Sequence, residues 1–336
     1  MEQHTVALIP GDGIGPEAVE AAQRVINATG VPIRWQTFEA GATALEKYGA
    51  PLPEALLEGI RRSGVALKGP ITTPIGVGFS SVNVALRREL ELYANLRPIK
   101  SIPGLPCRYR DVDLDIVREN TEGLYSGLER QVAPDTVEAI KRVTRRASLR
   151  IARFAFDYAR SHSRRTVTAV HKANILKLSD GLFLECAREV AEGYPDIEYR
   201  ERIVDALCMD LVLDPRRHDL LLCPNLYGDI VSDLAAGLVG GLGLIPAANI
   251  GDGLAVFEAV HGSAPDIAGQ GIANPTALIL AGAMMLSYLG EEETAQRIEE
   301  GVRKVYRDGV SLTPDVGGAA STWEMTDAVL NTMEER

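Results

Sequence analysis

The sequence predicts an α/β fold with a mostly parallel sheet and two domains. The chain has 336 residues, 46% of them hydrophobic, which is enough to bury a large core in two domains or in one large α/β unit. Apolar, β-rich runs alternate with amphipathic helical patterns along most of the chain, as expected when helices connect parallel strands. We find no internal repeat and no low-complexity segment.

The individual elements follow from hydrophobic period, capping residues and breakers. Pro16 suits the first turn of a helix that follows the first strand. We expect strands at Thr5–Ile9, Ile33–Phe38, Val65–Leu67, Asp113–Val117, Val167–Val170 and Leu220–Cys223. We expect helices at Pro16–Asn27, Pro53–Arg62, Val82–Leu92, Ile140–Arg160, Ser179–Glu192, Gly228–Val239, Pro275–Leu289 and Glu291–Arg307.

Composition excludes several classes of function. The net charge of −11 argues against nucleic acid as the main partner, because Lys and Arg must neutralise its phosphates. The apolar runs near 234–248 and 276–289 are too short to cross a bilayer. Four cysteines without Cys-x-x-Cys spacing favour free thiols in a reducing compartment, and no targeting segment is recognised. We therefore expect a soluble cytoplasmic protein, or a matrix protein if the chain is a processed mitochondrial one.

The segment Gly11-Asp-Gly-Ile-Gly15 resembles a dinucleotide fingerprint but does not match it. It lies between a predicted strand and a predicted helix, as the fingerprint does. However, Pro16 follows directly and the third glycine of G-x-G-x-x-G is missing. We interpret the segment as a tight turn, so a nicotinamide cofactor would not be held in the Rossmann manner.

Asp229 and Asp233 are four residues apart in Asn225-Leu-Tyr-Gly-Asp-Ile-Val-Ser-Asp233. On a helix this spacing places both carboxylates on one face, where they repel each other unless a cation lies between them. For the pair alone, acidic residues at a helix N-terminus, where the dipole favours them, are the better interpretation. A hard divalent cation becomes the better interpretation only when the rest of the chain is considered.

Three arginines and two proton-transfer candidates lie elsewhere in the chain. Arg87, Arg97 and Arg118 come from different elements, and several guanidinium groups suit a substrate with several carboxylates. We expect Arg97 at the end of an apolar helix and Arg118 directly after a strand. Lys172 follows another strand, where a nearby metal would favour its neutral form, and Tyr125 is a candidate proton donor. Singly, each of these residues also fits ordinary packing or a surface charge.

The loop from Phe257 to Gly269, followed by Asn274-Pro275, is rich in small residues and contains His261. Small residues let the backbone approach a flat ring or a phosphate closely. The carboxylate of Asp266 suits a ribose diol and repels a 2′-phosphate, which favours NAD over NADP.

Together these segments carry a family resemblance. Over nearly its whole length the chain resembles the metal-dependent β-decarboxylating dehydrogenases that act on isocitrate, homoisocitrate, 3-isopropylmalate and tartrate, and it is most similar to the short NAD-dependent isocitrate dehydrogenases. The resemblance implies an isopropylmalate dehydrogenase-like, non-Rossmann fold. It assigns 1–95 and 240–336 to a large domain and 96–239 to a small domain through which a homodimer, or a higher homo-oligomer, forms.

The resemblance also implies roles for residues at matching positions. Mg²⁺ or Mn²⁺ would be held by Asp229 and Asp233, with Asp205 from the neighbouring subunit acting as both ligand and catalytic group. Tyr125 matches the proton donor, and Lys172, again from the neighbour, matches the group that deprotonates the hydroxyl. Substrate carboxylates would be bound by Arg87, Arg97 and Arg118. The cofactor-binding set would be Thr73, Asn174, Glu258, His261, Gly262, Ala264, Asp266, Ile267 and Asn274.

Substrate choice is expected to depend on Ser81-Val-Asn83. The isocitrate enzymes carry Ser-x-Asn here, whereas the isopropylmalate enzymes present an apolar surface and the homoisocitrate enzymes a more basic segment. Asp266-Ile267 differs from the Lys-Tyr pair of NADP-using isocitrate enzymes. We therefore expect NAD-dependent oxidative decarboxylation of isocitrate. The alternatives are homoisocitrate or 3-isopropylmalate dehydrogenase, and a non-catalytic regulatory subunit.

Overall fold

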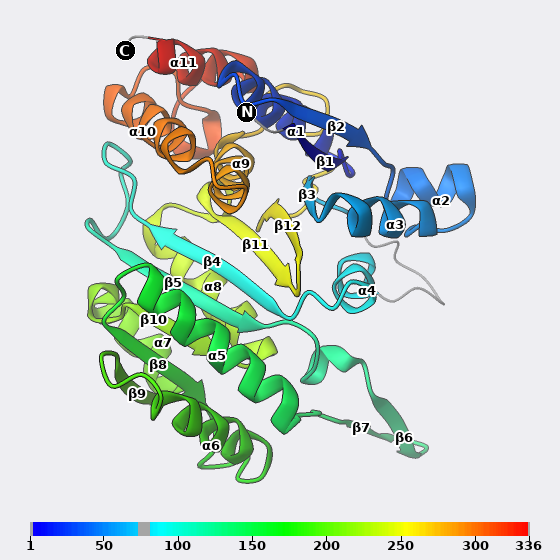
Figure 1. Cartoon of the computed structure of the whole chain (residues 1–336), viewed down its shortest axis with the longest axis vertical. Coiled ribbons are helices and arrows are strands. Elements are labelled where there is room, and N and C mark those ends of the chain that lie inside the picture. Colours follow the sequence, from blue (N-terminus) through cyan, green and yellow to red (C-terminus); the bar gives the residue numbers. More distant parts are fainter. Residues whose placement is uncertain (1–2, 73–80, 335–336) are drawn as a thin grey trace. The chain divides into compact units, whose positions relative to one another are not determined.

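The structure, a computed structural model, describes residues 3–72 and 81–334 and divides into two compact units. Unit 1 comprises residues 1–90, 101–110 and 239–336, and unit 2 comprises 91–100 and 111–238. The expected domains placed 91–95 with the large domain and 101–110 with the small one. Each unit contributes five strands to a mostly parallel sheet and flanks them with helices (Figure 1), which confirms the α/β class.

In unit 1 the strands lie in the order β2-β1-β3-β12-β11, parallel except for the antiparallel pair β11 and β12. The helices α1, α9, α10 and α11 pack on one another, and α9 also covers β11 and β12. The strands are β1 (His4–Ile9), β2 (Ile33–Thr37), β3 (Val65–Lys68), β11 (Pro246–Gly251) and β12 (Leu254–Ala259). The helices are α1 (Gly15–Ala28), α2 (Ala42–Tyr48), α3 (Glu54–Ser63), α4 (Val82–Glu89), α9 (Thr276–Tyr288), α10 (Glu292–Asp308) and α11 (Thr322–Glu334).

In unit 2 the order is β4-β5-β10-β8-β9, with only β4 and β5 antiparallel. The strands are β4 (Ala94–Lys100), β5 (Asp113–Glu119), β8 (Thr166–His171), β9 (Glu198–Ile203) and β10 (Leu220–Cys223). A separate hairpin consists of β6 (Glu129–Ala133) and β7 (Thr136–Ala139). The helices are α5 (Arg145–Ser161), α6 (Ser179–Ala191), α7 (Val204–Leu213) and α8 (Asn225–Val239).

Burial explains why the predicted strands formed. All four residues of β3 and of β10 are buried, as expected of interior parallel strands that are covered on both faces. By contrast, β9 alternates exposed and half-buried residues, because it is an edge strand of unit 2. Its polar sequence Glu-Tyr-Arg-Glu-Arg-Ile gave no apolar signal, and it was not predicted.

Two predictions were wrong in detail. Arg97 lies within β4, not at the end of a helix, because α4 already ends at Glu89 and the residue before Pro98 favours extended backbone. The helix expected from Ile140 begins only at Arg145, where the hydroxyl of Thr144 accepts a hydrogen bond from the amide of Ala147. Residues 140–144 form the connection between β7, which ends at Ala139, and α5.

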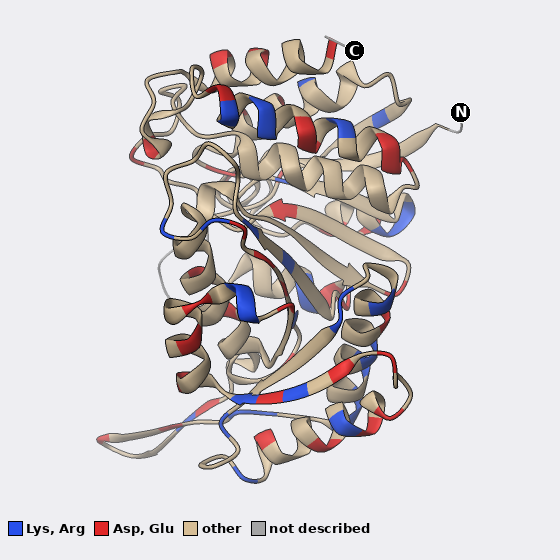
Figure 2. Ribbon diagram, turned by 90° about the vertical axis from the view of Figure 1, so that its left-hand side faces the viewer, with Lys and Arg blue, Asp and Glu red and all other residues tan. Residues whose placement is uncertain are grey.

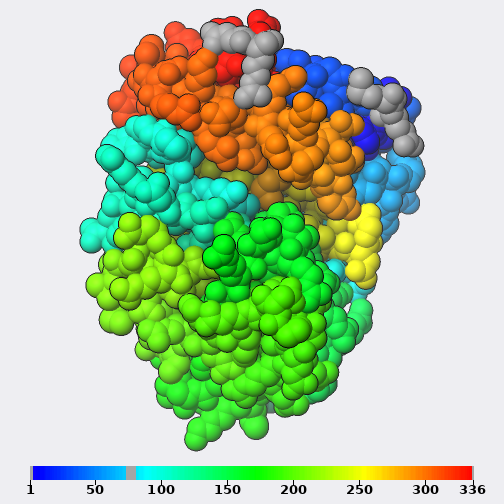
Figure 3. Space-filling model, turned by 60° about the vertical axis from the view of Figure 1, so that its left-hand side comes forward, coloured from blue at the N-terminus to red at the C-terminus, as the bar shows by residue number. Residues whose placement is uncertain are grey.

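Residues of both charge signs are interspersed along the chain (Figure 2). In unit 2 the residues around α5 and α6, green in Figure 3, form a continuous packed surface. No helix within 3–72 and 81–334 is long and apolar enough to cross a membrane. All four cysteines are free.

Candidate functional site

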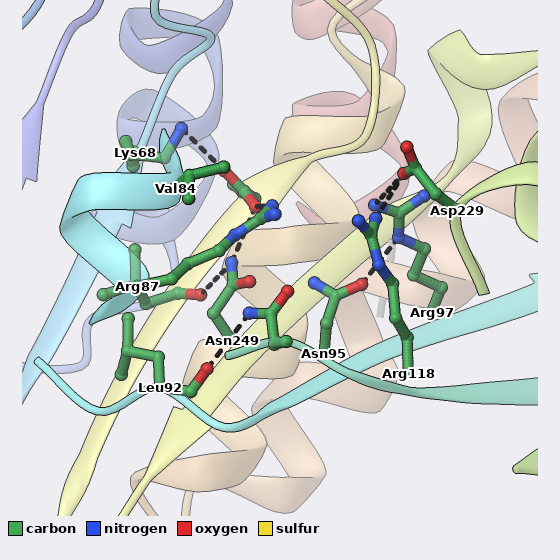
Figure 4. A network of polar contacts seen from close by, with 12 residues as sticks. Lys68, Val84, Arg87, Leu92, Asn95, Arg97, Arg118, Asp229 and Asn249 are labelled. Atoms are coloured by element: carbon green, nitrogen blue, oxygen red, sulfur yellow. Dashed lines mark hydrogen bonds and ion pairs between the residues drawn. The ribbon is translucent and has the colours of Figure 1, made fainter. Parts of the chain in front are cut away.

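Two arginines of unit 2 converge on one carboxylate. Arg97 extends from β4 and Arg118 from β5, and both point at Asp229 in the first turns of α8 (Figure 4). The Nη2 of Arg97 lies 3.5 Å from Asp229 Oδ1, and Arg118 pairs with the same oxygen at hydrogen-bonding distance. Both arginines are buried, so their charges are poorly screened by water.

Neutral side chains hold these guanidinium groups in place. Arg97 donates to Asn95 Oδ1 at 2.7 Å and to Ser232 Oγ at 2.5 Å. Arg118 donates to Asn225 Oδ1 through two nitrogens, at 3.1 and 2.8 Å. Gly228 is required beside it, because a Cβ there would lie 2.6 Å from the Arg118 Cγ. The Gly in Tyr-Gly-Asp therefore lets the helix approach the arginine.

Tyr125 joins the same cluster. Its hydroxyl donates to Asp229 Oδ2, and the Arg118 guanidinium lies 4.9 Å from the centre of its ring. Burial, reinforced by the hydrogen bond to the Asp229 carboxylate, raises the pKa of Tyr125 above its ordinary value. The phenol is therefore neutral at pH 7 and carries a proton that it can donate.

The two aspartates of α8 suit a divalent cation. Asp229 is about one-third exposed and Asp233 is exposed, and Arg97 Nη1 lies 3.7 Å from Asp233 Oδ1. Burial raises the pKa of Asp233; Arg97 lowers it and the neighbouring Asp229 raises it. Hard carboxylate oxygens on one helix face are the donors that Mg²⁺ and Mn²⁺ prefer. Within the described ranges, no three His, Cys, Asp or Glu residues are grouped to hold a metal.

Lys172 and Asp205 form a pair of their own in unit 2. Lys172 directly follows β8 and is half-buried, and its ammonium group pairs with Asp205 in the first turn of α7. The hydrogen bond from Lys172 lowers the pKa of Asp205. Asn174, in the same segment, is exposed. One chain thus brings Lys172 and Asp205 together, and separately brings Asp229 and Asp233 together.

In unit 1, Ser81 and Arg87 lie at opposite ends of α4. Ser81 is the N-cap, and its Oγ accepts a hydrogen bond of 3.5 Å from the amide of Val84. The Oδ1 of Asn83 is buried and makes no hydrogen bond with any residue that the structure describes. That acceptor suits a ligand group that donates a hydrogen bond.

A buried charge network surrounds Glu258 of β12. Lys68 Nζ lies 2.6 Å and Arg87 Nη2 3.1 Å from its carboxylate, which also accepts from Asn249 at 2.6 Å. Figure 4 shows Lys68 and Arg87 directed toward this carboxylate. Glu258 therefore contacts Arg87, one of the candidate substrate arginines, and does not line the cavity described below. Sequence reasoning missed Lys68 as its partner.

We expect Glu258→Gln to destabilise unit 1. Burial raises the pKa of Glu258, but the charges of Lys68 and Arg87 outweigh burial and hold that pKa well below its ordinary value. Removing one charge of such a buried cluster costs about 3–5 kcal/mol in the free energy of unfolding.

A depressed pKa stabilises the fold above the ordinary carboxyl pKa near 4.5, and that contribution is lost as pH falls below it. Thermal melts should therefore show a large difference between variant and wild type at pH 7 that narrows by about pH 3.5. An equal difference at both pH values would contradict this assignment.

A cavity of about 380 Å³ lies in unit 1 beside the His261 loop. Its lining includes five predicted cofactor residues, His261, Gly262, Ala264, Ile267 and Asn274. Burial lowers the pKa of His261, so the imidazole is neutral at pH 7 and fits beside a planar ring. Asp266 is exposed and does not line the cavity, and Thr73 lies outside the described residues.

The glycine-containing turn between β1 and α1 also reaches this cavity. Ile14 lines it, and its amide donates to the carbonyl of Ser263 at 2.9 Å. A Cβ at Gly13, whose φ is +61°, would lie 1.9 Å from that carbonyl oxygen. The turn is thus structural, as expected, but its close approach to the His261 loop was not predicted. Asp315, another lining residue, was also missed.

Comparison with known proteins identifies the family. The family model "Isocitrate/isopropylmalate dehydrogenase" matches residues 5–329. The chain belongs to this family. It is 54% identical to catalytic subunit 5 of the mitochondrial NAD isocitrate dehydrogenase of Arabidopsis thaliana, over 97% of this chain and 87% of that one. It is 53% identical to the chloroplastic 3-isopropylmalate dehydrogenase of Solanum tuberosum, over 90% and 85%. Among solved structures, isocitrate dehydrogenase from Methylococcus capsulatus superposes with a TM-score of 0.95 at 55% identity, over 99% and 100%.

This membership confirms the family prediction and identifies the chain as an oxidoreductase of a family that uses a small carboxylate substrate, NAD and a divalent metal. The arginine cluster, the aspartates and the cavity are consistent with those three ligands.

Proposed function

We propose that the protein catalyses NAD-dependent oxidative decarboxylation of isocitrate to 2-oxoglutarate and CO₂. The observation that carries this proposal is the convergence of Arg97, Arg118 and Tyr125 on Asp229. This convergence supports a site in unit 2 that takes an anionic substrate and a cation beside a proton donor.

In this proposal Asp229 and Asp233, joined by Asp205 from a second copy of the chain, hold Mg²⁺ or Mn²⁺. The bound ion would act as a Lewis acid on the substrate oxygens, and NAD would be the hydride acceptor. Arg97 and Arg118, which contact Asp229 in this structure, would bind substrate carboxylates once a cation took over their charge at Asp229. Arg87 binds another carboxylate, and Ser81 and Asn83 select isocitrate.

Two residues move protons. Lys172 removes the proton of the substrate hydroxyl as a pair with Asp205, whose carboxylate is ionised at pH 7 because the hydrogen bond from Lys172 lowers its pKa, and can accept the proton. Tyr125, neutral because of its raised pKa, donates its proton to the carbon that loses CO₂.

The test is NADH formation from isocitrate, NAD and Mg²⁺ or Mn²⁺, with and without EDTA. Parallel kcat/KM measurements with homoisocitrate and 3-isopropylmalate decide between the family's substrates, and the potato relative makes the second comparison necessary. Higher kcat/KM with either rival substrate would overturn the isocitrate assignment.

For cofactor choice, we expect the double substitution Asp266→Lys, Ile267→Tyr to raise kcat/KM for NADP relative to NAD by about tenfold or more. A cation in place of the carboxylate attracts a 2′-phosphate instead of repelling it. The measurement is kcat/KM with each nucleotide. Asp308→Lys, which makes the same charge change at an exposed site outside the cavity lining, is the matched control and should not alter the ratio.

We also propose that the chain works as a homodimer or higher homo-oligomer. Exposed apolar side chains in unit 2 support this: Leu178, Met209, Val212, Leu213 and Ile230. Met209, Val212 and Leu213 lie at i, i+3 and i+4 on α7, and large apolar side chains exposed on one helix face favour a contact with another chain. Location in the cytoplasm, or in the mitochondrial matrix as the Arabidopsis relative's name states for that protein, fits four free cysteines.

A non-catalytic regulatory role is the remaining alternative. The chain keeps Tyr125, Lys172 and all three aspartates. Turnover by the purified chain alone would exclude that alternative, whereas activity only in the presence of a different subunit would favour it.

A further inference from the structure

Asp180 is a buried carboxylate that none of the steps above uses. It lies in the first turn of α6 and its side chain is 1% exposed, which is rare for Asp without strong partners. Its Oδ1 pairs with the ammonium group of Lys141, and its Oδ2 accepts from the Tyr227 hydroxyl at 3.1 Å. The same Oδ2 accepts from the backbone amide of Lys172 at 2.7 Å.

These three donors come from three different parts of unit 2. Lys141 lies between the β6–β7 hairpin and α5, Lys172 directly follows β8, and Tyr227 precedes Asp229 by two residues on α8. A further contact closes the network, because Lys141 Nζ lies 4.6 Å from the centre of the Tyr227 ring. One carboxylate thus ties the main chain of Lys172 to the helix that carries Asp229 and Asp233.

The segment after β8 depends on this anchor. The carbonyl of Lys172 accepts from the amides of Ile175 and Leu176, at 2.9 and 2.8 Å, which forms a turn whose outer side chains are exposed. Little apolar packing therefore fixes the turn. The hydrogen bond from the Lys172 amide to Asp180 is the contact that attaches its first residue to the interior.

We propose that Asp180 is the positioning residue for Lys172, with Lys141 and Tyr227 holding its carboxylate in place. The proposal rests on the proposed role of Lys172 in proton transfer. Asp180 does not touch substrate; it fixes the backbone from which the lysine side chain extends, and a misplacement of about 1 Å is enough to reduce turnover up to a hundredfold.

The primary test is Asp180→Asn, which keeps the shape but removes the charge. We expect kcat to fall roughly tenfold to a hundredfold while KM for NAD changes less than about twofold, because the cavity whose lining suits NAD lies in unit 1. Hydrogen exchange should also speed up at the amide of Lys172, a readout that does not depend on activity.

The matched control is Asp115→Asn. Asp115 is equally buried and pairs with Arg164 at 2.8 Å, but it lies near the amino end of β5, away from the ends that carry Arg118 and Lys172. This variant should lower the melting temperature as much as Asp180→Asn and leave kcat unchanged. A fall in kcat equal to that of Asp180→Asn would overturn the positioning role and indicate general loss of stability.

A double-mutant cycle with Lys172→Met separates positioning from direct action. If Asp180 works through Lys172, Asp180→Asn should cost nothing further in the residual activity of Lys172→Met. If Asp180→Asn does not fold, Tyr227→Phe takes its place in the cycle, because it removes only the hydrogen bond from the Tyr227 hydroxyl to Asp180. It should lower kcat a few-fold in the wild-type background and not at all in the Lys172→Met background. An undiminished cost in either cycle would contradict the inference. A wild-type chain inactive with isocitrate would instead reject the proposed function.

Discussion

Lys172→Met should lower kcat by roughly 10²–10⁴, the scale expected for a positioned acid–base group. The side chain lies against Asp205, and Met keeps its length and apolar stem while removing the ammonium group. Binding of NAD should change little. The decisive measurement is single-turnover NADH formation at saturating isocitrate and metal.

A control in the same segment tests whether charge alone matters. Lys177 is five residues further on and is exposed, so Lys177→Met removes the same charge without touching the Asp205 pair. It should retain wild-type turnover. A Lys172→Met variant with near wild-type kcat would remove Lys172 from the mechanism.

The local sequence predicted those parts of the molecule that depend on local physics. The apolar run Leu220–Cys223 forms a strand with the predicted bounds, as expected of a short run that is buried on both faces of a sheet. The i, i+4 aspartates share a helix because α8 begins before them. Arg118 comes directly after the mostly apolar residues 114–117, as expected, but it still belongs to β5, which ends at Glu119.

Contacts between distant segments could not be predicted. The Lys68–Glu258 and Lys141–Asp180 pairs join residues far apart in the sequence, and each charged residue alone looks like an ordinary surface charge. The extended backbone at Arg97 was missed because β4 is stabilised by pairing with β5, an antiparallel contact that no periodicity within residues 94–100 reveals. Family resemblance predicted the roles of the site residues, but these two ion pairs and the pairing of β4 with β5 are seen only in the structure.

Two inactive variants should restore each other's activity. If each active site takes Asp229 from one chain and Lys172 from its neighbour, a hybrid dimer of Asp229→Asn and Lys172→Met chains contains one intact site and one site with both changes. Random pairing of equal amounts makes half of the dimers hybrids, so about a quarter of wild-type activity should return. Co-expression with two tags allows the hybrid to be purified and assayed directly.

The structure provides the control for this experiment. Lys172 and Asp205 pair within one chain, so both should be donated to the same site. A hybrid of Lys172→Met with Asp205→Asn then has one defect in each site and should stay inactive, although it too combines two different variants. Recovery in the first hybrid but not in the second requires a site shared between chains, with Lys172 and Asp205 on one side and Asp229 on the other. If neither hybrid recovers activity, each chain holds a complete active site of its own. The metal would then be bound without Asp205, because Asp205 is not grouped with Asp229 and Asp233 among the described residues.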